Sequence, residues 1–420
     1  MSKIRVGIIG VGGRGVNCFG KIFSTQFADD VEIAGLADPN RVRAEAGMEL
    51  LKINAPIYEN AEDLIKRRDI HAVVVTAPDF LHESICITAF KHGKHVLVDK
   101  PLATSAMGCL NVMESAHRAK KLLYMGFNLR HAPILRKTKE LASAGAFGEI
   151  FSIQAIEYYN GGRTYMARWN RLKKFTGGLF IHKGSHDFDI INWIMGGARP
   201  AQVSCFANVF TLNPQHLPFK TRPGVKPGPT CSVCPYAKEC PDVIPENEFE
   251  ADKAGRTGMY GAKAAAIDGY RKNLCMYLSD KDTHDQGVAI VLYDNGATAM
   301  HSEYFATPKT DRHYFIEGTK GHAEVNLSDN LIEVLPRWSS DRIEYKLSAS
   351  SGDHGGADPI MCAEFISCLK KGLRPAAAGI DGAWSVAIGE SCELSRMKNR
   401  VVKISEVLDL KHPLLKDRRA

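Results

Sequence analysis

Two histidines lie four residues apart in an otherwise apolar segment, residues 177–195. On a helix of ~100° per residue, one narrow stripe would hold His182, His186, Asp189 and Trp193. Histidine has an unperturbed pKa of ~6.5 and exchanges a proton near neutral pH. The pattern is compatible with a metal pair, an acid–base pair or two core histidines.

The residue after the first histidine favours acid–base chemistry over metal binding. Zinc helices of the H-E-x-x-H pattern carry a glutamate there, whereas this chain has Lys183. An ammonium group at that position would repel a divalent metal ion. Oxidation of a secondary alcohol removes a hydride and a proton, and a base with a pKa near the working pH takes up the proton.

A lysine in a predicted turn is a second candidate for this chemistry. Lys100 follows an apolar strand-like run, and open α/β sheets bind ligands at the carboxyl ends of their strands. Pro101 fixes the turn and makes a cis peptide bond plausible. A buried lysine with a lowered pKa can stabilise an alkoxide or titrate. The alternative is an exposed lysine at the end of a strand.

A glycine-rich turn near the N-terminus predicts a dinucleotide site. The G-x-G-x-x-G pattern between a strand and a helix brings backbone N–H groups and the helix dipole to a pyrophosphate. The predicted contacts are Gly10, Gly12, Gly13, Arg14 and Gly15. Asp38 ends the second strand, where a carboxylate binds the ribose hydroxyls. Asp38 repels a 2′-phosphate and favours NAD, while Arg41 and Arg43 keep NADP open.

The elements that position these residues form two predicted domains. Apolar strands alternating with helices in residues 1–128 predict an NAD(P)-binding Rossmann domain with a doubly wound parallel sheet. Residues 129–420 predict a substrate-binding and oligomerisation α+β domain with a large, open, mostly antiparallel sheet. A Pro- and Cys-rich insertion spans 212–247, and helical patterns at 358–371 and 381–398 are expected to pack back toward the first domain.

An ordered set of further motifs accompanies the glycine turn. They are Thr76-Ala77-Pro78-Asp79 with His82, Asp99-Lys100-Pro101, Gly126-Phe127-Asn128 with Arg130 and Pro133, and Gly177-Gly178 through Asp189. Together they resemble the Gfo/Idh/MocA family of sugar and inositol oxidoreductases. Asp79 stands where the family pattern has Asn, and Asp99 where it has Glu.

The resemblance implies roles for individual residues. It adds to the cofactor site Thr76, Pro78, His82, Asp99, Lys100 and Asn128. It implies that His186 is the catalytic acid/base and Lys100 its partner. Most relatives have an acidic residue where this chain has His182, so we expect His182 to be an unusual third member that alters the proton relay.

Aromatic and basic residues before the histidine segment predict a polyol site. Tyr165, Arg168 and Trp169 can stack on a sugar face and hydrogen-bond its hydroxyls, with a solvated loop anchored by Trp169 as the alternative. Lys100, Lys183 and His186 complete the predicted substrate-binding set.

The insertion holds a cysteine group of the form C-x2-C-x5-C. Cys231, Cys234 and Cys240 suit a tetrahedral structural zinc with Cys275 as fourth ligand and His216 as an alternative. The alternatives for these cysteines are free thiols or a disulfide.

Composition narrows the class of protein. The net charge is +7, but the basic residues are spread along the chain, which argues against nucleic-acid binding. No apolar run approaches the ~20 residues of a membrane span. The absence of a signal-peptide pattern and the scattered cysteines predict a reduced, cytoplasmic protein.

These features predict an NAD-dependent oxidoreductase that acts between nicotinamide and a secondary hydroxyl or carbonyl of a carbohydrate, cyclitol or glycoside. One alternative is an NAD-dependent glycosidase working by transient oxidation and elimination. Another is a non-catalytic dinucleotide-sensing protein. A sheet with one uncovered face predicts a homodimer or homotetramer.

Overall fold

The computed structural model describes residues 3–245, 259–348 and 356–416. In these ranges the first domain is a six-stranded parallel sheet of order β3-β2-β1-β4-β5-β6. Its strands are β1 Ile4–Ile9, β2 Val31–Ala37, β3 Ile57–Tyr58, β4 Ala72–Val75, β5 His95–Asp99 and β6 Leu123–Gly126. The strands are mostly apolar because helices cover both faces of the sheet.

Helices of several lengths connect the strands and shape the site. They are α1 Lys21–Thr25, α2 Arg41–Leu51, α3 Ala61–Ile65, α4 His82–Lys91, α5 Ala106–Ala119, α6 Pro133–Ser143, α7 Gly162–Tyr165, α8 Lys173–Thr176, α9 Leu179–His182, α10 Ser185–Met195, α12 Ala262–Asp268, α13 Ala357–Lys371 and α14 Gly379–Lys398. No helix in the described ranges is long and apolar enough to cross a membrane.

The second domain is built on a larger sheet. In the described residues it has nine strands in the order β14-β13-β12-β11-β7-β10-β9-β8-β15, and only the pair β7–β10 is parallel. The strands are β7 Ile150–Asn160, β8 Pro200–Asn208, β9 Gln286–Tyr293, β10 Thr298–Tyr304, β11 Ala306–Gly318, β12 Gly321–Asn326, β13 Leu331–Pro336, β14 Ile343–Lys346 and β15 Val402–Lys403. The predicted fold class is confirmed.

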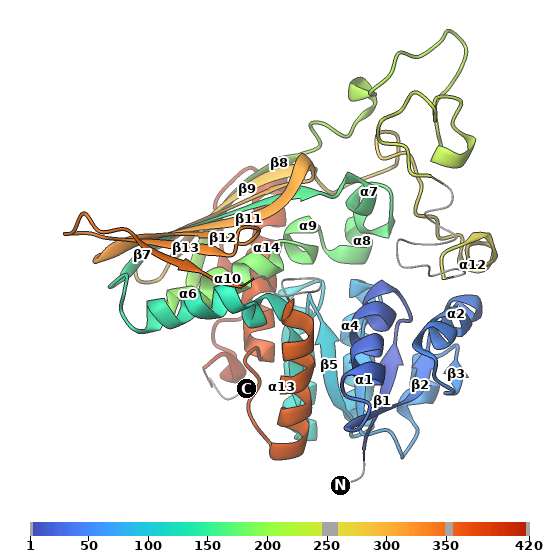
Figure 1. Cartoon of the computed structure of the whole chain (residues 1–420), viewed down its shortest axis with the longest axis horizontal. Helices are drawn as coiled ribbons and strands as arrows, with labels where there is room; N and C mark the ends of the chain where they lie inside the picture. Colours follow the sequence, from blue (N-terminus) through green and yellow to red (C-terminus); the bar gives the residue numbers. More distant parts are fainter. Residues whose placement is uncertain (1–2, 246–258, 349–355, 417–420) are drawn as a thin grey trace.

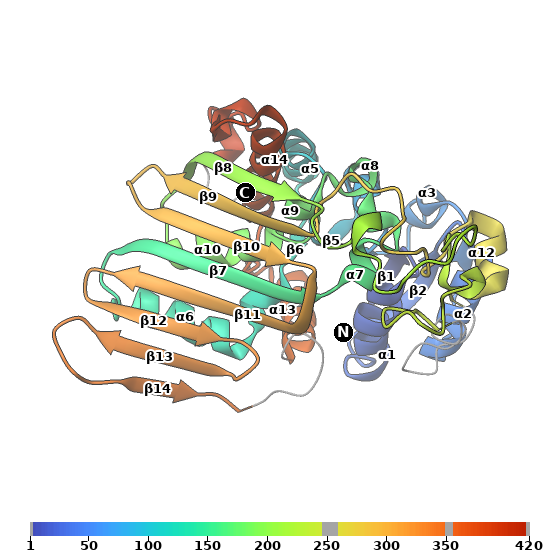
Figure 2. The ribbon, with the colours of Figure 1, turned by 90° about the horizontal axis from the view of Figure 1, so that it is seen from above.

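One face of this sheet is covered and the other is open. Helices α6, α10 and α14 lie beneath it in Figure 1, and Figure 2 shows the opposite face without a covering layer. Large apolar side chains are exposed on the sheet strands, namely Phe151, Phe206, Ile290, Leu292, Leu335 and Ile343.

Helix α13 belongs structurally to the first domain, although it comes from the far end of the chain. Phe365 of α13 is buried in the same apolar cluster as Phe19, Phe23 and Tyr124. Its ring centroid lies 5.5 Å from that of Tyr124 and 6.5 Å from that of Phe23. The C-terminal region therefore completes the core under the parallel sheet.

We expect Phe365→Ala to lower the free energy of unfolding by about 3–5 kcal/mol, because it leaves a cavity between α13 and the sheet. Leu373→Ala is the control, since Leu373 is 51% exposed, and its effect should stay within about 0.5 kcal/mol. Urea unfolding followed by fluorescence measures both. Equal effects would contradict the attachment of α13 to the first domain.

Candidate active site

A cleft of about 1030 Å³ runs between the parallel sheet and the second domain. The predicted cofactor, catalytic and substrate residues line it, apart from Gly15. Gly15 lies behind the turn, where an added Cβ would come within 2.3 Å of the Gly10 carbonyl oxygen. Its role is therefore close packing of helix against strand.

The glycine turn has the shape that a dinucleotide requires. Gly10 has φ +92°, and a Cβ there would lie 2.4 Å from the backbone nitrogen of Ala77. Gly12 is open toward the cleft. Among the described residues, the one atom near an added Cβ would be the Tyr260 hydroxyl oxygen, at 3.2 Å. The turn precedes the helix Arg14–Gly20, whose N-terminus offers a positive dipole. These residues fit a pyrophosphate.

Asp38 closes the adenosine end of the cleft. Its carboxylate accepts hydrogen bonds from the N–H groups of Val11 and Asn40, both at 2.9 Å. Arg43 lies 3.4 Å away. Burial raises the pKa of Asp38, and Arg43 and the backbone donors oppose that rise.

An ion-pair network ties the glycine turn to the lysine turn. Arg14 contacts Asp99 at 2.9 Å and Asp358 at 3.2 Å, and the Asn128 amide donates to Asp358 at 2.8 Å. Although burial opposes ionisation, Arg14 and Lys100 hold the pKa of Asp99 below its usual value. Asp358 is on α13, so the last third of the chain helps to fix the cofactor turn.

His82 joins two motif turns rather than facing outward. One ring nitrogen lies 2.7 Å from the carbonyl oxygen of Pro101, and the other lies 2.8 Å from that of Ala77. The Lys100–Pro101 peptide bond is cis, as expected. Although His82 borders the cleft, its two nitrogens hold the turns that flank Lys100.

Lys100 reaches from the sheet edge to the second domain. Its ammonium donates a hydrogen bond to the backbone carbonyl of His182. Burial lowers the pKa of Lys100 to about 8, against the opposing effect of Asp79 and Asp99. The positive charge of Lys183 adds to the lowering. Lys100 is thus able to change protonation state near physiological pH.

The single histidine stripe expected from the sequence is wrong. Helix α9 ends at His182 and α10 begins at Ser185, so the two histidines lie on different helices. Asp189 instead forms a buried ion pair with Arg130 at 2.6 Å, and Trp193 lies under the same guanidinium at 5.5 Å. Both histidines still line the cleft, but Asp189 and Trp193 do not.

The carboxylate that contacts His182 is Asp79, which the sequence analysis did not select. Nδ1 of His182 lies 2.6 Å from Asp79, and the amide nitrogen of Asn170 lies 2.9 Å from Nε2. With the Asn170 amide as donor, Nε2 is the acceptor and Nδ1 carries the proton toward Asp79. Burial lowers the pKa of His182, which favours this neutral ring.

A sequence signal for this pair existed. Asp79 occupies the family's Asn position and His182 the family's acidic position, so two departures from the pattern are complementary. Considered together, they predict that a carboxylate on the first domain pairs with an imidazole on the second, where the family pattern has an amide and an acid.

The substrate end of the cleft is aromatic and basic. His186 is 7% exposed there, with its ring 6.1 Å from that of Phe127. The rings of Tyr165 and Trp169 pack edge-on against His182 at 5.6 and 5.5 Å.

Two cations complete this end of the cleft. Lys183 pairs with Glu157 at 2.8 Å and lies 4.3 Å over the ring of Tyr159. Nε of Arg168 is buried and has no hydrogen-bond partner among the described residues. Lys183 is therefore fixed in the wall, and Arg168 lines the same end of the cleft.

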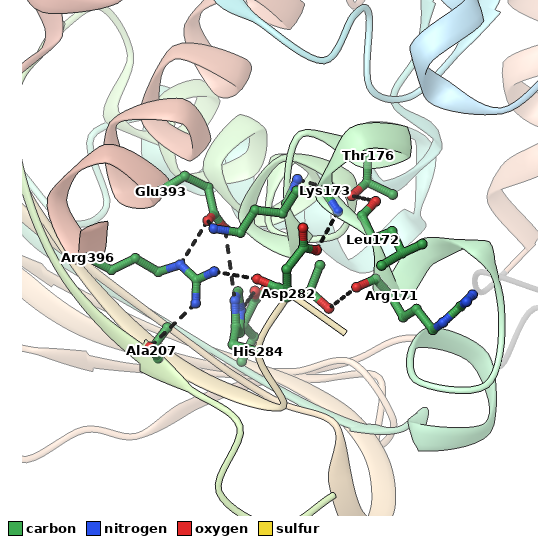
Figure 3. Close-up of polar contacts among 12 residues, drawn as sticks. Arg171, Leu172, Lys173, Thr176, Ala207, Asp282, His284, Glu393 and Arg396 are labelled. Carbon is green, nitrogen blue, oxygen red and sulfur yellow. Dashed lines mark hydrogen bonds and ion pairs between the residues drawn. The ribbon is translucent and has the colours of Figure 1, made fainter. Parts of the chain in front are cut away.

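Helix α14 contacts residues 171–176, which precede the short helix α9 that ends at His182 (Figure 3). Glu393 pairs with Lys173 at 2.7 Å and with Arg396 at 2.8 Å. At Gly178, which has φ +120°, an added Cβ would come within 2.3 Å of Glu393. The Gly-Gly turn is therefore required for the close approach of α9 to this buried carboxylate.

The structure does not support the predicted zinc site. Cys231, Cys234, Cys240 and Cys275 are free thiols, and no group of three or more His, Cys, Asp or Glu side chains in the described ranges is arranged to hold a metal ion. Backbone pairing fixes this part of the insertion instead. The Cys231 N–H donates to the Asn273 carbonyl at 2.9 Å, and the Cys275 N–H to the Pro229 carbonyl at 2.8 Å.

Family models match both parts of the chain. Residues 4–127 match the oxidoreductase family, NAD-binding Rossmann fold, and residues 139–404 match the C-terminal alpha/beta domain of the same family. The chain belongs to the Gfo/Idh/MocA oxidoreductase family. This confirms the resemblance carried by its motifs and makes the protein an NAD(P)-dependent oxidoreductase.

Individual relatives agree with this assignment. The protein YteT of Bacillus subtilis (strain 168) is 27% identical over 96% of this chain and 98% of its own length. An inositol 2-dehydrogenase of Serratia proteamaculans is 33% identical, but the match covers 46% of this chain and just over half, 54%, of that protein.

Solved structures of two dehydrogenases share the fold. Levoglucosan dehydrogenase, solved with NADH and levoglucosan, is 16% identical with a TM-score of 0.72 over 96% of this chain and 100% of that one. The WlbA dehydrogenase of Bordetella pertussis, solved with NADH and UDP-GlcNAcA, is 18% identical with a TM-score of 0.67 over 96% and 99%. At these identities the likeness establishes the fold alone.

We expect Asp79→Ala to lower the free energy of unfolding by about 1–3 kcal/mol, because the buried Nδ1–H of His182 loses its acceptor. Asp79→Asn keeps an acceptor oxygen and should cost less. Asp63→Ala, at an exposed position on α3, is the control. Chemical denaturation measures all three. A loss for Asp79→Ala no larger than the control would show that the pair does not form.

Proposed function

We propose that this family member is an NAD-dependent dehydrogenase acting on a secondary hydroxyl, or the corresponding carbonyl, of a carbohydrate, cyclitol or glycoside. The observation that carries the proposal is the meeting of Lys100 and His186 in one cleft, at the carboxyl edge of the dinucleotide-binding sheet. An aromatic and basic wall on the opposite side of the cleft supports a hydroxyl-rich substrate.

NAD is the proposed cofactor because Asp38 presents a carboxylate where a 2′-phosphate would enter. The glycine turn, Arg14 and Thr76 would hold it, with Asn128, Pro78 and His82 shaping the nicotinamide end. The bound nicotinamide supplies the hydride acceptor or donor. The protein residues then need only to exchange the proton and to stabilise the negative charge on the oxygen.

In this proposal His186 exchanges the proton of the substrate hydroxyl as general acid/base. The Lys100 ammonium stabilises the negative charge that develops on the oxygen. Its hydrogen bond to the His182 carbonyl holds it between the domains. The chain thus provides an imidazole and an ammonium in the same cleft, which suits reaction at a C–OH group.

His182 remains part of the proposed catalytic set, as a positioning residue. Both of its ring nitrogens have neighbours, Asp79 and Asn170, so it acts through them rather than on the substrate hydroxyl. Asp79 supplies a negative charge beside His182, although position 182 itself is not acidic. Between the two enzyme functions we propose the dehydrogenase.

For substrate binding we propose Tyr165 and Trp169 as stacking surfaces and Arg168 as a donor to hydroxyls. Lys183, fixed by Glu157, contributes positive charge at the same end. Lys100 and His186 contact the reacting oxygen. Supporting this reading, the cleft wall combines aromatic rings with hydrogen-bond donors, as sites for small polar ligands do.

A homodimer or homotetramer through the open sheet face is also proposed. The exposed apolar side chains of that face come from strands as far apart as β8 and β14. Apolar surface exposed on an open sheet face often marks a protein–protein contact, and a homodimer can pair the same face of two copies. Light scattering of the purified protein tests it.

His186→Ala should lower turnover by about a hundredfold or more, because the proton no longer has an acceptor in the cleft. NADH binding, measured by fluorescence, should be kept. His92→Ala, an exposed histidine at the end of α4, is the matched control. Turnover near that of the unchanged protein would remove His186 from the mechanism.

The activity should fall as the pH rises through about 8, because Lys100 then loses the proton that stabilises the developing alkoxide. Lys100→Arg keeps a positive charge at all accessible pH values, so whatever activity it retains should lack this alkaline fall. The pH profile of kcat/KM measures both. An identical alkaline fall in the arginine variant would assign it to another group.

A further inference from the structure

A segment that follows the insertion in the chain forms a wall of the cleft at its adenosine end. Residues 259–272, here called the clasp, include helix α12, which lies beside α2 of the first domain (Figure 1). The clasp side chains on the cleft are Tyr260, Asp268, Tyr270 and Lys272. Asp38 and Arg43 line the same end of the cleft, so its cofactor end is bounded by the first domain and by the clasp.

Direct hydrogen bonds attach the clasp to the dinucleotide motif. The Gly13 N–H donates to the Tyr260 hydroxyl at 2.8 Å. The buried Asn40 amide donates to the Ala264 carbonyl and to the Asp268 carboxylate, both at 2.8 Å. The clasp therefore contacts both the turn that faces a pyrophosphate and the residues that follow the ribose-binding aspartate.

All three guanidinium nitrogens of Arg43 are engaged, two of them by the clasp and one by Asp38. Nε donates to the Met259 carbonyl at 3.2 Å, Nη2 to Asp268 at 2.7 Å and Nη1 to Asp38 at 3.4 Å. Its guanidinium lies over the rings of Tyr260 and Tyr270, at 5.4 and 5.9 Å. An arginine near this position is the group that accommodates a 2′-phosphate in NADP sites, but here it is already engaged.

We propose that the clasp is a second wall of the dinucleotide site and that its Asp268 restricts the site to NAD by engaging Arg43. The inference rests on the proposed function, because it assumes a nicotinamide dinucleotide in this cleft. A 2′-phosphate entering here meets two carboxylates, Asp38 and Asp268, and finds the guanidinium bound to both. Rejection of the wrong ligand by like charge is a common source of specificity.

Asp268 keeps its charge in this setting. Burial opposes ionisation, but hydrogen bonds from Asn40, from the Tyr270 N–H and from Arg43 hold the pKa of Asp268 below its usual value. The carboxylate is therefore ionised at neutral pH and competes with any phosphate for Arg43.

The test measures NADH and NADPH binding by titration calorimetry, without substrate. For Asp268→Asn, the ratio of the NADPH to the NADH dissociation constant should fall by about tenfold or more, because a like charge is removed and Arg43 is released. Glu49→Gln is the matched control, since Glu49 is an exposed carboxylate on the same helix, α2. It should leave the ratio unchanged. Asp268→Ser replaces the asparagine variant if that fails to fold.

A double variant isolates the role of the arginine. In an Arg43→Ala background, Asp268→Asn should change the ratio by about threefold or less, because the phosphate then lacks its charge-assisted hydrogen bonds. A ratio that does not fall in the single variant, or equal weakening of both cofactors, overturns the inference. If the unchanged protein binds neither cofactor, the proposed function itself fails.

Discussion

The contact between the Lys100 ammonium and the carbonyl of His182 joins the two domains at the point where chemistry would occur. Lys100 belongs to the turn after a parallel strand, and His182 ends a short helix of the second domain. The lysine is buried, so its charge requires compensation. Asp79 and Asp99 supply it from neighbouring turns of the same sheet edge. The relative position of the domains and the electrostatics of the cleft therefore depend on one another.

The arrangement of charged groups around His182 follows from the same need to compensate the charge of Lys100. An acidic residue at position 182 would place a carboxylate beside Lys100 from the second domain, whereas this chain supplies the carboxylate from Asp79 on the first. The imidazole then links that carboxylate to Asn170. Negative charge near Lys100 is retained, but it sits nearer the cofactor side of the cleft. A substrate would accordingly meet a neutral ring and an amide where many family members present an acid.

The residues that could be predicted from the sequence are those whose backbone setting is local. The glycine turn, Asp38 and the Asp-Lys-Pro turn each follow an apolar strand, so their position at the sheet edge comes directly from strand–turn–helix periodicity. Helix α2 was not identified, because its buried residues Ala44, Gly47 and Leu51 are mostly small and give a weak apolar stripe. Strand β8 is difficult to predict from the sequence, because the exposed Phe206 breaks the alternation of apolar and polar residues.

Contacts between distant segments could not be derived in the same way. The break between α9 and α10 moves Asp189 to Arg130 and leaves His182 to Asp79, although helical spacing alone places Asp189 beside the histidines. The cysteine spacing suggested a metal-held loop, but the contacts with the first domain are made by the clasp that follows the insertion, through Asn40, Gly13 and Arg43. Each of these pairings joins residues more than a hundred positions apart or depends on a helix end. The clasp is thus held by the cofactor-binding domain, and in return it adds carboxylate and aromatic groups to a site whose glycine turn and Asp38 are recognisable from sequence alone.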